Sequence, residues 1–147
     1  VERRYWQEIQ ANTAAGKRNA AAASAARPQA AVKQSAWQEV IEDDTLANIT
    51  ARSIITGFNS PGQHEVLAPF TDRYFEAING VWERRSSEVA QTVVVGLYPS
   101  WDISRPAIEA ADRFLSDPQV PPALRRLVVE GRAGIERSLK ARAFDGG

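Results

Sequence analysis

The chain contains a single histidine, His64, and the residue that follows it is Glu65. This pair begins like the helical His-Glu-x-x-His signature, in which two imidazoles one turn apart hold zinc and the glutamate is a general base. The fifth position is Ala68, and the sequence has no second histidine and no cysteine. A typical zinc site needs several such ligands. We therefore predict no metal ligand and no catalytic residue here, and interpret His64 as an exposed residue at a helix start.

A second group of candidates is acidic, and its members are Glu39, Glu42, Asp43 and Asp44. Calcium loops place oxygen ligands at alternating positions around a central glycine, a spacing that is absent here. Asp43 and Asp44 stand before an apolar stripe, where they would cap a new helix and place negative charge at its positive end. Helix capping therefore explains this cluster better than metal binding or acid–base chemistry.

A third group of charged and aromatic residues lies at the junction of two predicted helices and consists of Trp82, Arg84, Arg85 and Glu88. A corner of this kind can hold a planar guanidinium against an aromatic ring or a carboxylate. Three interpretations remain: a structural corner first, contact with a ligand second, and general anion binding third. If a substrate contact exists in this chain, these four residues are the candidates for it.

Composition limits the classes of protein. The 147 residues suit one domain, and 44% hydrophobic with 24% charged residues is typical of a globular chain. Eighteen basic residues balance eighteen acidic ones, which gives no support for a nucleic-acid or anionic-membrane binder. The longest apolar run is shorter than a membrane span, and residues 1–10 lack the layout of a signal peptide. Because the chain has no methionine and so no start residue, we expect a processed product or a piece of a longer protein. The expected location is the cytoplasm.

Helix-breaking residues punctuate the chain at fairly regular intervals, and the apolar residues between them recur mostly at helical spacing. The alanine-rich segment 19–27 is predicted to be a helix rather than a linker, because alanine is the best helix former. The dipeptide Asn79-Gly80 is predicted to end one helix. The predicted helices cover residues 19–27, 29–42, 46–58, 63–78, 86–98, 104–117 and 121–143.

The segment 86–98 is ambiguous, because its β-branched run 92–95 could form a buried strand. A helix is favoured, since Ser86 is a plausible N-cap, Glu88 would lie in the first turn, and Val89, Val93 and Leu97 share one face. The chain is therefore predicted to be all-α, with about seven to eight antiparallel helices in stacked, HEAT-like hairpins. The predicted core residues are Trp37, Phe58, Phe70, Phe75, Val93, Leu97, Phe114, Leu127 and Ile135.

Extended sequence patterns over nearly the whole chain resemble one family, the C-terminal α-helical domain of bacterial aminopeptidase N. The match is most similar to the form found in high-GC Gram-positive bacteria. It is carried by Trp-Gln-Glu at 37–39, Asp-Asp-Thr-Leu-Ala-Asn at 43–48, Gly-Phe at 57–58, Arg-Tyr-Phe at 73–75, and the segments 74–101 and 121–144. The resemblance implies that residues 1–147 form one C-terminal domain whose missing portion lies on the N-terminal side.

In that family, zinc metallopeptidases of the gluzincin class, a zinc-bearing domain precedes the helical domain, which closes over the active site and shapes peptide access. The zinc ligands, the Gly-x-Met-Glu-Asn motif and the transition-state tyrosine lie upstream, so no catalytic residue is carried over. The resemblance implies that this fragment alone is not an enzyme and holds no cofactor. Its implied partners are the upstream catalytic domain and peptide substrates. The alternative is a free-standing helical scaffold that binds a protein or peptide.

Overall fold

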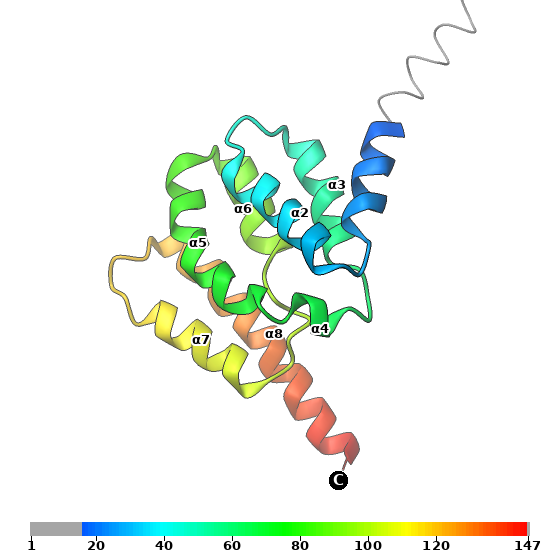
Figure 1. Cartoon of the computed structure of the whole chain (residues 1–147). Coiled ribbons are helices and arrows are strands. Elements are labelled where there is room, and N and C mark those ends of the chain that lie inside the picture. The colour runs from blue at the N-terminus through cyan, green and yellow to red at the C-terminus, as the bar shows by residue number, and fades with distance from the viewer. Residues whose placement is uncertain (1–15, 147) are drawn as a thin grey trace, which may run out of the picture.

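The computed structural model describes residues 16–146, and every regular element in this range is a helix (Figure 1). The predicted all-α class is therefore confirmed. A first helix occupies the described residues 16–25. The later helices are α2 (Ala30–Glu42), α3 (Asn48–Phe58), α4 (His64–Leu67), α5 (Phe70–Arg84), α6 (Ser87–Gly96), α7 (Arg105–Leu115) and α8 (Pro122–Gly146).

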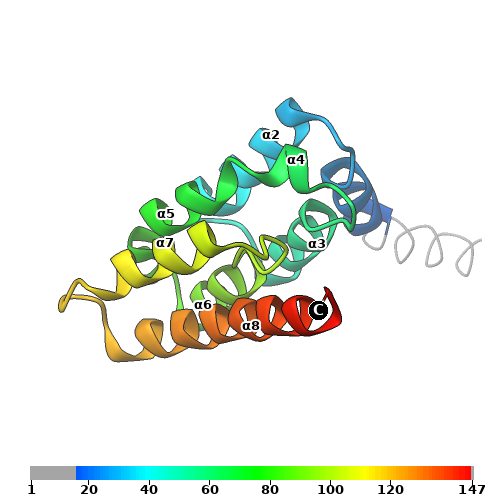
Figure 2. The same ribbon diagram turned by 90° about the horizontal axis from the view of Figure 1, so that it is seen from below.

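The helices form two layers, which Figure 2 shows one above the other. One layer contains α2, α5 and α7, with the short α4 between α2 and α5, and the other contains α3, α6 and α8. Consecutive helices pack as the hairpins α2–α3, α5–α6 and α7–α8, and each layer is held by contacts between neighbouring hairpins. This arrangement is compatible with the predicted stacked hairpins. Within residues 16–146, no helix combines the length and the apolar character that crossing a membrane requires.

Aromatic side chains fill the core where α2, α3 and α5 meet. The ring of Trp37 lies 5.8 Å from that of Phe58 and 5.1 Å from that of Phe70, and the latter two rings meet edge to face at 5.1 Å. Such tilted and edge-on pairs are the favoured aromatic geometries. These three residues are buried as predicted, together with Val93, Leu97 and Ile135.

Three predicted core residues, Phe75, Phe114 and Leu127, are only half-buried, although they pack against the core. The rings of Phe75 and Phe114 lie 5.7 Å apart and line a surface groove between α5 and α7. They seal the contact between these two helices, and one side of each ring remains open to solvent. The position of these three residues on apolar helix faces therefore predicted correctly that they contact the core, but it did not predict how far they are buried.

The prediction of one helix over 63–78 that stops at Asn79-Gly80 was wrong. The chain forms α4, turns at residues 68–69, and then continues through Asn79-Gly80 to the end of α5 at Arg84. A Cβ on Gly80 would lie 2.7 Å from an Nη atom of Arg84. The glycine therefore makes room for a guanidinium on the same helix rather than ending the helix.

The predicted start of the helix over 86–98 is confirmed. Ser86 is the N-cap of α6, and its Oγ accepts a hydrogen bond from the Val89 amide at 3.4 Å. Ser104 does the same for α7, where its Oγ accepts from the Ala107 amide at 3.3 Å. Because the β-branched run 92–95 packs as part of α6, the strand alternative is excluded for this segment.

Carbonyl groups at helix C-termini are paired by side chains from other parts of the fold. In residues 16–146, the only positive backbone φ is that of Gly62, so these helices do not end in a left-handed residue. The last turns instead receive hydrogen bonds from long polar side chains. The donor and acceptor residues are Lys33 with Ala25 and Phe58, Arg85 with Val40 and Ile41, Tyr74 with Val94, Asn59 with Gly96, and Arg125 with Leu115.

Candidate functional site

The arginine of the predicted corner that is most buried is Arg85, whose side chain is 2% exposed. Its Nε donates to Oδ1 of Asp44 at 2.6 Å, and its Nη2 donates to the carbonyl oxygens of Val40 and Ile41 at 3.0 and 2.9 Å. The guanidinium thus closes the C-terminal end of α2, where the helix dipole favours a cation. Arg85 holds α2 against the junction of α5 and α6.

Arg84 reaches the same region from the solvent side. Its Nη2 donates to the Ile41 carbonyl at 3.0 Å and its Nε lies 3.4 Å from Oδ1 of Asp44, while its side chain is 45% exposed. The hydrogen bond from Arg85, and secondarily that from Arg84, lowers the pKa of Asp44 below its ordinary value of 3.8. The two arginines therefore share one carboxylate and one helix end.

The other two members of the corner make different contacts. Trp82 is half-buried and packs against the core. Glu88 is exposed on α6, and its Oε1 accepts a hydrogen bond from the side-chain amide of Asn48 at 3.0 Å. The structure therefore brings Arg84 and Arg85 together with Asp44 and gives both a structural role. Substrate contact at this corner stays a prediction. Arg84 and Glu88 are the two members whose exposed side chains could make it.

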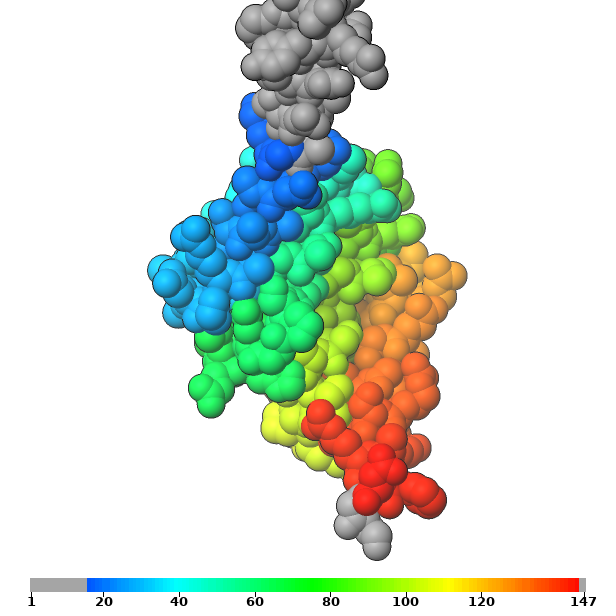
Figure 3. Space-filling view, turned by 90° about the vertical axis from the view of Figure 1, so that its right-hand side faces the viewer, coloured from blue at the N-terminus to red at the C-terminus, as the bar shows by residue number. Residues whose placement is uncertain are grey.

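A groove of about 510 Å³ runs between α3 and α6, and Glu88 is one of its lining residues. The groove is also lined by Arg52, Gln91, Thr92 and the exposed Val95. Opposite charges and apolar area lie side by side here, which is a lining that suits polypeptide better than a uniformly charged ligand. In Figure 3, α3 and α6 lie side by side in the face that is turned to the viewer.

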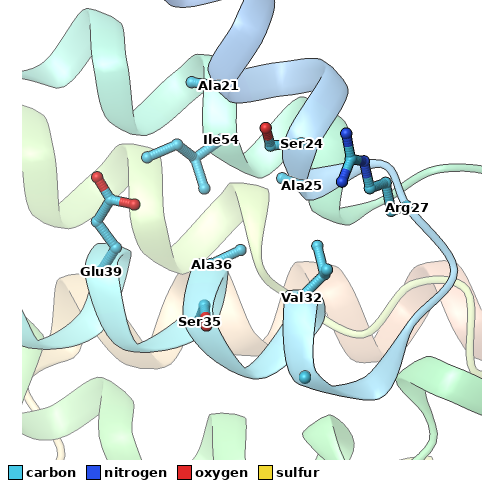
Figure 4. A pocket seen from close by; sticks show the side chains of 10 residues that line it. Ala21, Ser24, Ala25, Arg27, Val32, Ser35, Ala36, Glu39 and Ile54 are labelled. Carbon is cyan, nitrogen blue, oxygen red and sulfur yellow. The ribbon is translucent and has the colours of Figure 1, made fainter.

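A second pocket, of about 460 Å³, lies between helix 16–25, α2 and α3 (Figure 4). Small and apolar residues line most of it, among them Ala25, Ala36 and Ile54, which are themselves buried. Exposed Arg27 and Glu39 stand at its two ends in Figure 4. The pocket therefore has an apolar middle between two opposite charges.

Lys33 is a buried charged residue that sequence analysis missed. Its Nζ donates to the carbonyl oxygens of Ala25 at 2.6 Å, Gly57 at 3.3 Å and Phe58 at 3.1 Å, and it is fully buried. Loss of solvent around the ammonium lowers the pKa of Lys33. Its burial could have been predicted from its position, because Lys33 lies on the buried side of α2, one turn before Trp37.

The acidic cluster and the histidine take other positions than metal ligands would. Asp43 accepts from the amide and hydroxyl of Thr45 at 3.0 and 2.6 Å, which forms a local turn. The N-cap of α3 is Ala47, so the prediction that Asp43 or Asp44 caps this helix was wrong. The ring of exposed His64 stacks on Trp101 with 6.1 Å between centroids. Within the described range, no three His, Asp or Glu side chains are grouped so as to hold a metal.

Two comparisons with known proteins agree. The sequence model of the family described as ERAP1-like C-terminal domain matches residues 3–137. Aminopeptidase N of Streptomyces lividans is 49% identical over 133 residues, which cover 90% of this chain and 16% of that protein. The chain thus spans about a sixth of the length of this relative.

Proposed function

The chain belongs to the family of ERAP1-like C-terminal domains, and from this membership we propose that it covers the peptide-binding cleft of a zinc aminopeptidase. It is a C-terminal domain of an aminopeptidase N-like protein. In the proposed arrangement, an upstream domain of the same polypeptide carries zinc and removes N-terminal amino acids. The helical domain described here limits and shapes the access of peptides. The family match over residues 3–137 is the observation that carries this proposal.

The layer of α3, α6 and α8 is the face that we assign to the cleft. The exposed large hydrophobic residues of the described chain are Ile49 on α3, Val95 on α6, and Val129 and Phe144 on α8. All of them belong to this layer, and none belongs to α2, α5 or α7. This one-sided distribution supports the assignment, because exposed apolar surface is what a site for polypeptide needs. The groove between α3 and α6 lies in the same layer.

The proposed substrate contacts are Arg84, at the end of α5 where the chain passes to this layer, and Glu88 on α6. A guanidinium can bind a peptide carboxylate through two hydrogen bonds, and a glutamate can accept from peptide amides or cationic side chains. Such contacts would lie far from the zinc. They would therefore act on substrates long enough to reach them and would leave short substrates unaffected.

The test is made in the complete polypeptide, with a longer peptide and a single-residue chromogenic amide as substrates. Arg84→Ala and Glu88→Gln are each expected to lower kcat/KM for the peptide by about tenfold, the equivalent of one lost charge-assisted contact. The amide should be turned over at the wild-type rate. Arg113→Ala, which removes an exposed arginine of α7 outside this corner, is the matched control. Equal losses on both substrates would refute the assigned contact, and a polypeptide without aminopeptidase activity would refute the proposed function.

A further inference from the structure

A third pocket, of about 350 Å³, lies where α4, the connection between α6 and α7, and the C-terminal part of α8 meet. These three segments are far apart in the sequence, and Figure 1 shows the connection close to both α4 and α8. The volume falls within the range of about 300–1,000 Å³ that is usual for sites of small molecules. The side chains that line the pocket therefore indicate which small molecule it could bind.

One side of this pocket is aromatic and apolar. Trp101 and Ile103 belong to the connection between α6 and α7, are half-buried, and pack against the core. The ring of His64 stacks on that of Trp101, with 6.1 Å between the two centroids. Because the core holds both residues of the connection in place, this surface exists before a ligand arrives. It can receive an apolar or aromatic group.

The rest of the lining carries charges of both signs. Oδ1 of Asp102 accepts a hydrogen bond from the hydroxyl of Ser104 and Oδ2 accepts one from the hydroxyl of Thr71, both at 2.7 Å. These bonds fix the carboxylate and leave it able to accept further hydrogen bonds. Glu65 and Arg142, which also line the pocket, are exposed. Among residues 16–146, neither of them forms an ion pair, so the charges of the pocket do not neutralise one another by direct contact.

A matching ligand must combine a cation, an anion and an apolar part within a small volume. A free α-amino acid does so, because its ammonium and carboxylate are attached to the same carbon as its side chain. A ligand with only one charge would leave part of the lining without a partner. A segment within a polypeptide matches less well, since its ammonium and carboxylate are replaced by uncharged amide groups.

We propose that this pocket binds a free α-amino acid with an apolar or aromatic side chain. Arg142 binds the carboxylate, for which a guanidinium offers two parallel hydrogen bonds. Glu65 and Asp102 accept hydrogen bonds from the ammonium, and the side chain of the ligand lies against Trp101. The assignment of this ligand as a reaction product rests on the proposed function, because an aminopeptidase releases free amino acids. The helical domain then carries a binding site for product.

The test follows Trp101 by fluorine NMR in the complete polypeptide labelled with fluorotryptophan, where Trp101→Phe identifies its resonance. L-Phenylalanine is expected to shift this resonance and to saturate. Two analogues each lack one of the charges: phenylpropanoate has no ammonium, and phenethylamine has no carboxylate. Each analogue is expected to bind at least about tenfold more weakly than L-phenylalanine, the equivalent of one lost charge-assisted contact.

Variants assign the contacts to residues. Arg142→Gln and Glu65→Gln are each expected to raise the Kd of L-phenylalanine by at least about tenfold. Both side chains are exposed, so neither change removes a buried contact. The matched control is Arg137→Gln, which changes an exposed arginine of the same helix that does not line the pocket, and it should leave the Kd unchanged.

Three outcomes would overturn the inference. The first is a Trp101 resonance that does not respond to L-phenylalanine. The second is equal binding of L-phenylalanine and either analogue, which would show that one of the charges is not recognised. The third is an equal Kd for Arg142→Gln and Arg137→Gln. The NMR measurement does not depend on catalysis. Saturable binding by a polypeptide without aminopeptidase activity would therefore keep the amino-acid site and refute only its assignment to product.

Discussion

The Nζ of Lys33 lies 2.6 Å from the carbonyl oxygen of Ala25 and 3.1 Å from that of Phe58, so one ammonium closes the ends of two helices. Carbonyl groups in the last turn of a helix lack partners within it and carry partial negative charge. In this fold, lysine, arginine, tyrosine and asparagine side chains supply the missing donors. The helix ends are thereby tied to distant segments, and stability depends on a small number of buried polar contacts.

Lys33→Met is expected to lower the free energy of unfolding by about 1–3 kcal/mol. Methionine fills a similar volume but leaves buried carbonyl groups without a donor, and such groups cost about this much each. The gain from no longer burying an ammonium offsets part of the loss. Urea denaturation of the chain measures the change. Lys140→Met, at an exposed ion pair with Glu136, should change stability by less than about 0.5 kcal/mol. A similar effect for both lysines would contradict the capping role.

The two arginines of the corner are expected to differ in their contributions to stability. Arg85→Ala should destabilise the chain by about 2–4 kcal/mol, because it leaves Val40 and Ile41 carbonyls and Asp44 without their buried donor. Arg84→Ala should cost less than about 1 kcal/mol, since its side chain is nearly half exposed and screened by solvent. Thermal unfolding of both variants checks the order. A larger loss for Arg84→Ala would reverse the assignment of the structural arginine.

Asp44 gives this corner a pH dependence with a defined sign. Its pKa is lowered from 3.8 in the folded chain, first by the hydrogen bond from Arg85, so the folded state holds this proton less tightly than the unfolded state. The carboxylate therefore contributes stability above pH 3.8, and this contribution is lost as the pH falls toward the folded pKa. Asp44→Asn should be less stable than wild type at pH 7, and the difference should shrink below pH 4 (roughly the unfolded value). A difference that is constant from pH 7 to pH 3 would argue against this ion pair.

Features that depend on neighbouring residues in the sequence could be predicted. Ser86 and Ser104 each cap the helix that starts immediately after them, and a serine before an apolar stripe shows this directly. Val93 and Leu97 could be placed in the core because they recur on one helical face. The choice of helix over strand for residues 92–95 depended on the same periodicity, and it was confirmed.

Features that depend on distant partners could not be predicted. The residue types at 84 and 85 indicated a structural corner, but their acceptors on α2 lie more than 40 positions earlier in the chain. The dipeptide Asn79-Gly80 predicts a helix end because such pairs mark turns, whereas in the fold the space that Gly80 leaves is filled by Arg84. The hydrogen bonds of Lys33 could not be predicted for a related reason. A lysine within an apolar stripe gains its acceptors only when other helices end beside it.

Two neighbouring tyrosines are expected to respond in different ways to loss of the hydroxyl. The Tyr74 hydroxyl donates to the Val94 carbonyl at 2.6 Å, whereas the buried Tyr98 hydroxyl has no hydrogen-bond partner among the described residues. Tyr74→Phe should cost about 1–2 kcal/mol, because it leaves a carbonyl of α6 unpaired. Tyr98→Phe should be neutral or stabilising by up to about 1 kcal/mol, because it removes a buried polar atom that makes no bond. The melting temperatures of both variants measure these changes. An equal decrease for Tyr74→Phe and Tyr98→Phe would show that the Tyr98 hydroxyl has a hydrogen-bond partner in solution.

Alanine substitutions at two helical glycines are expected to have opposite signs. A Cβ on Gly57 would collide with the carbonyl oxygen of Ala22 and lie 2.9 Å from the Cβ of Ala25, whereas on Gly134 its nearest neighbour would be an Nη atom of Arg137 at 3.8 Å. Gly57→Ala should therefore destabilise the chain by about 1–3 kcal/mol, since helix 16–25 would have to move away from α3. Gly134→Ala should stabilise it by about 0.5–1 kcal/mol, because alanine restricts the unfolded chain and favours helix. Urea denaturation measures both changes. Stabilisation by Gly57→Ala would show that helix 16–25 does not pack closely on α3, and the pocket between them would then lose one of its walls.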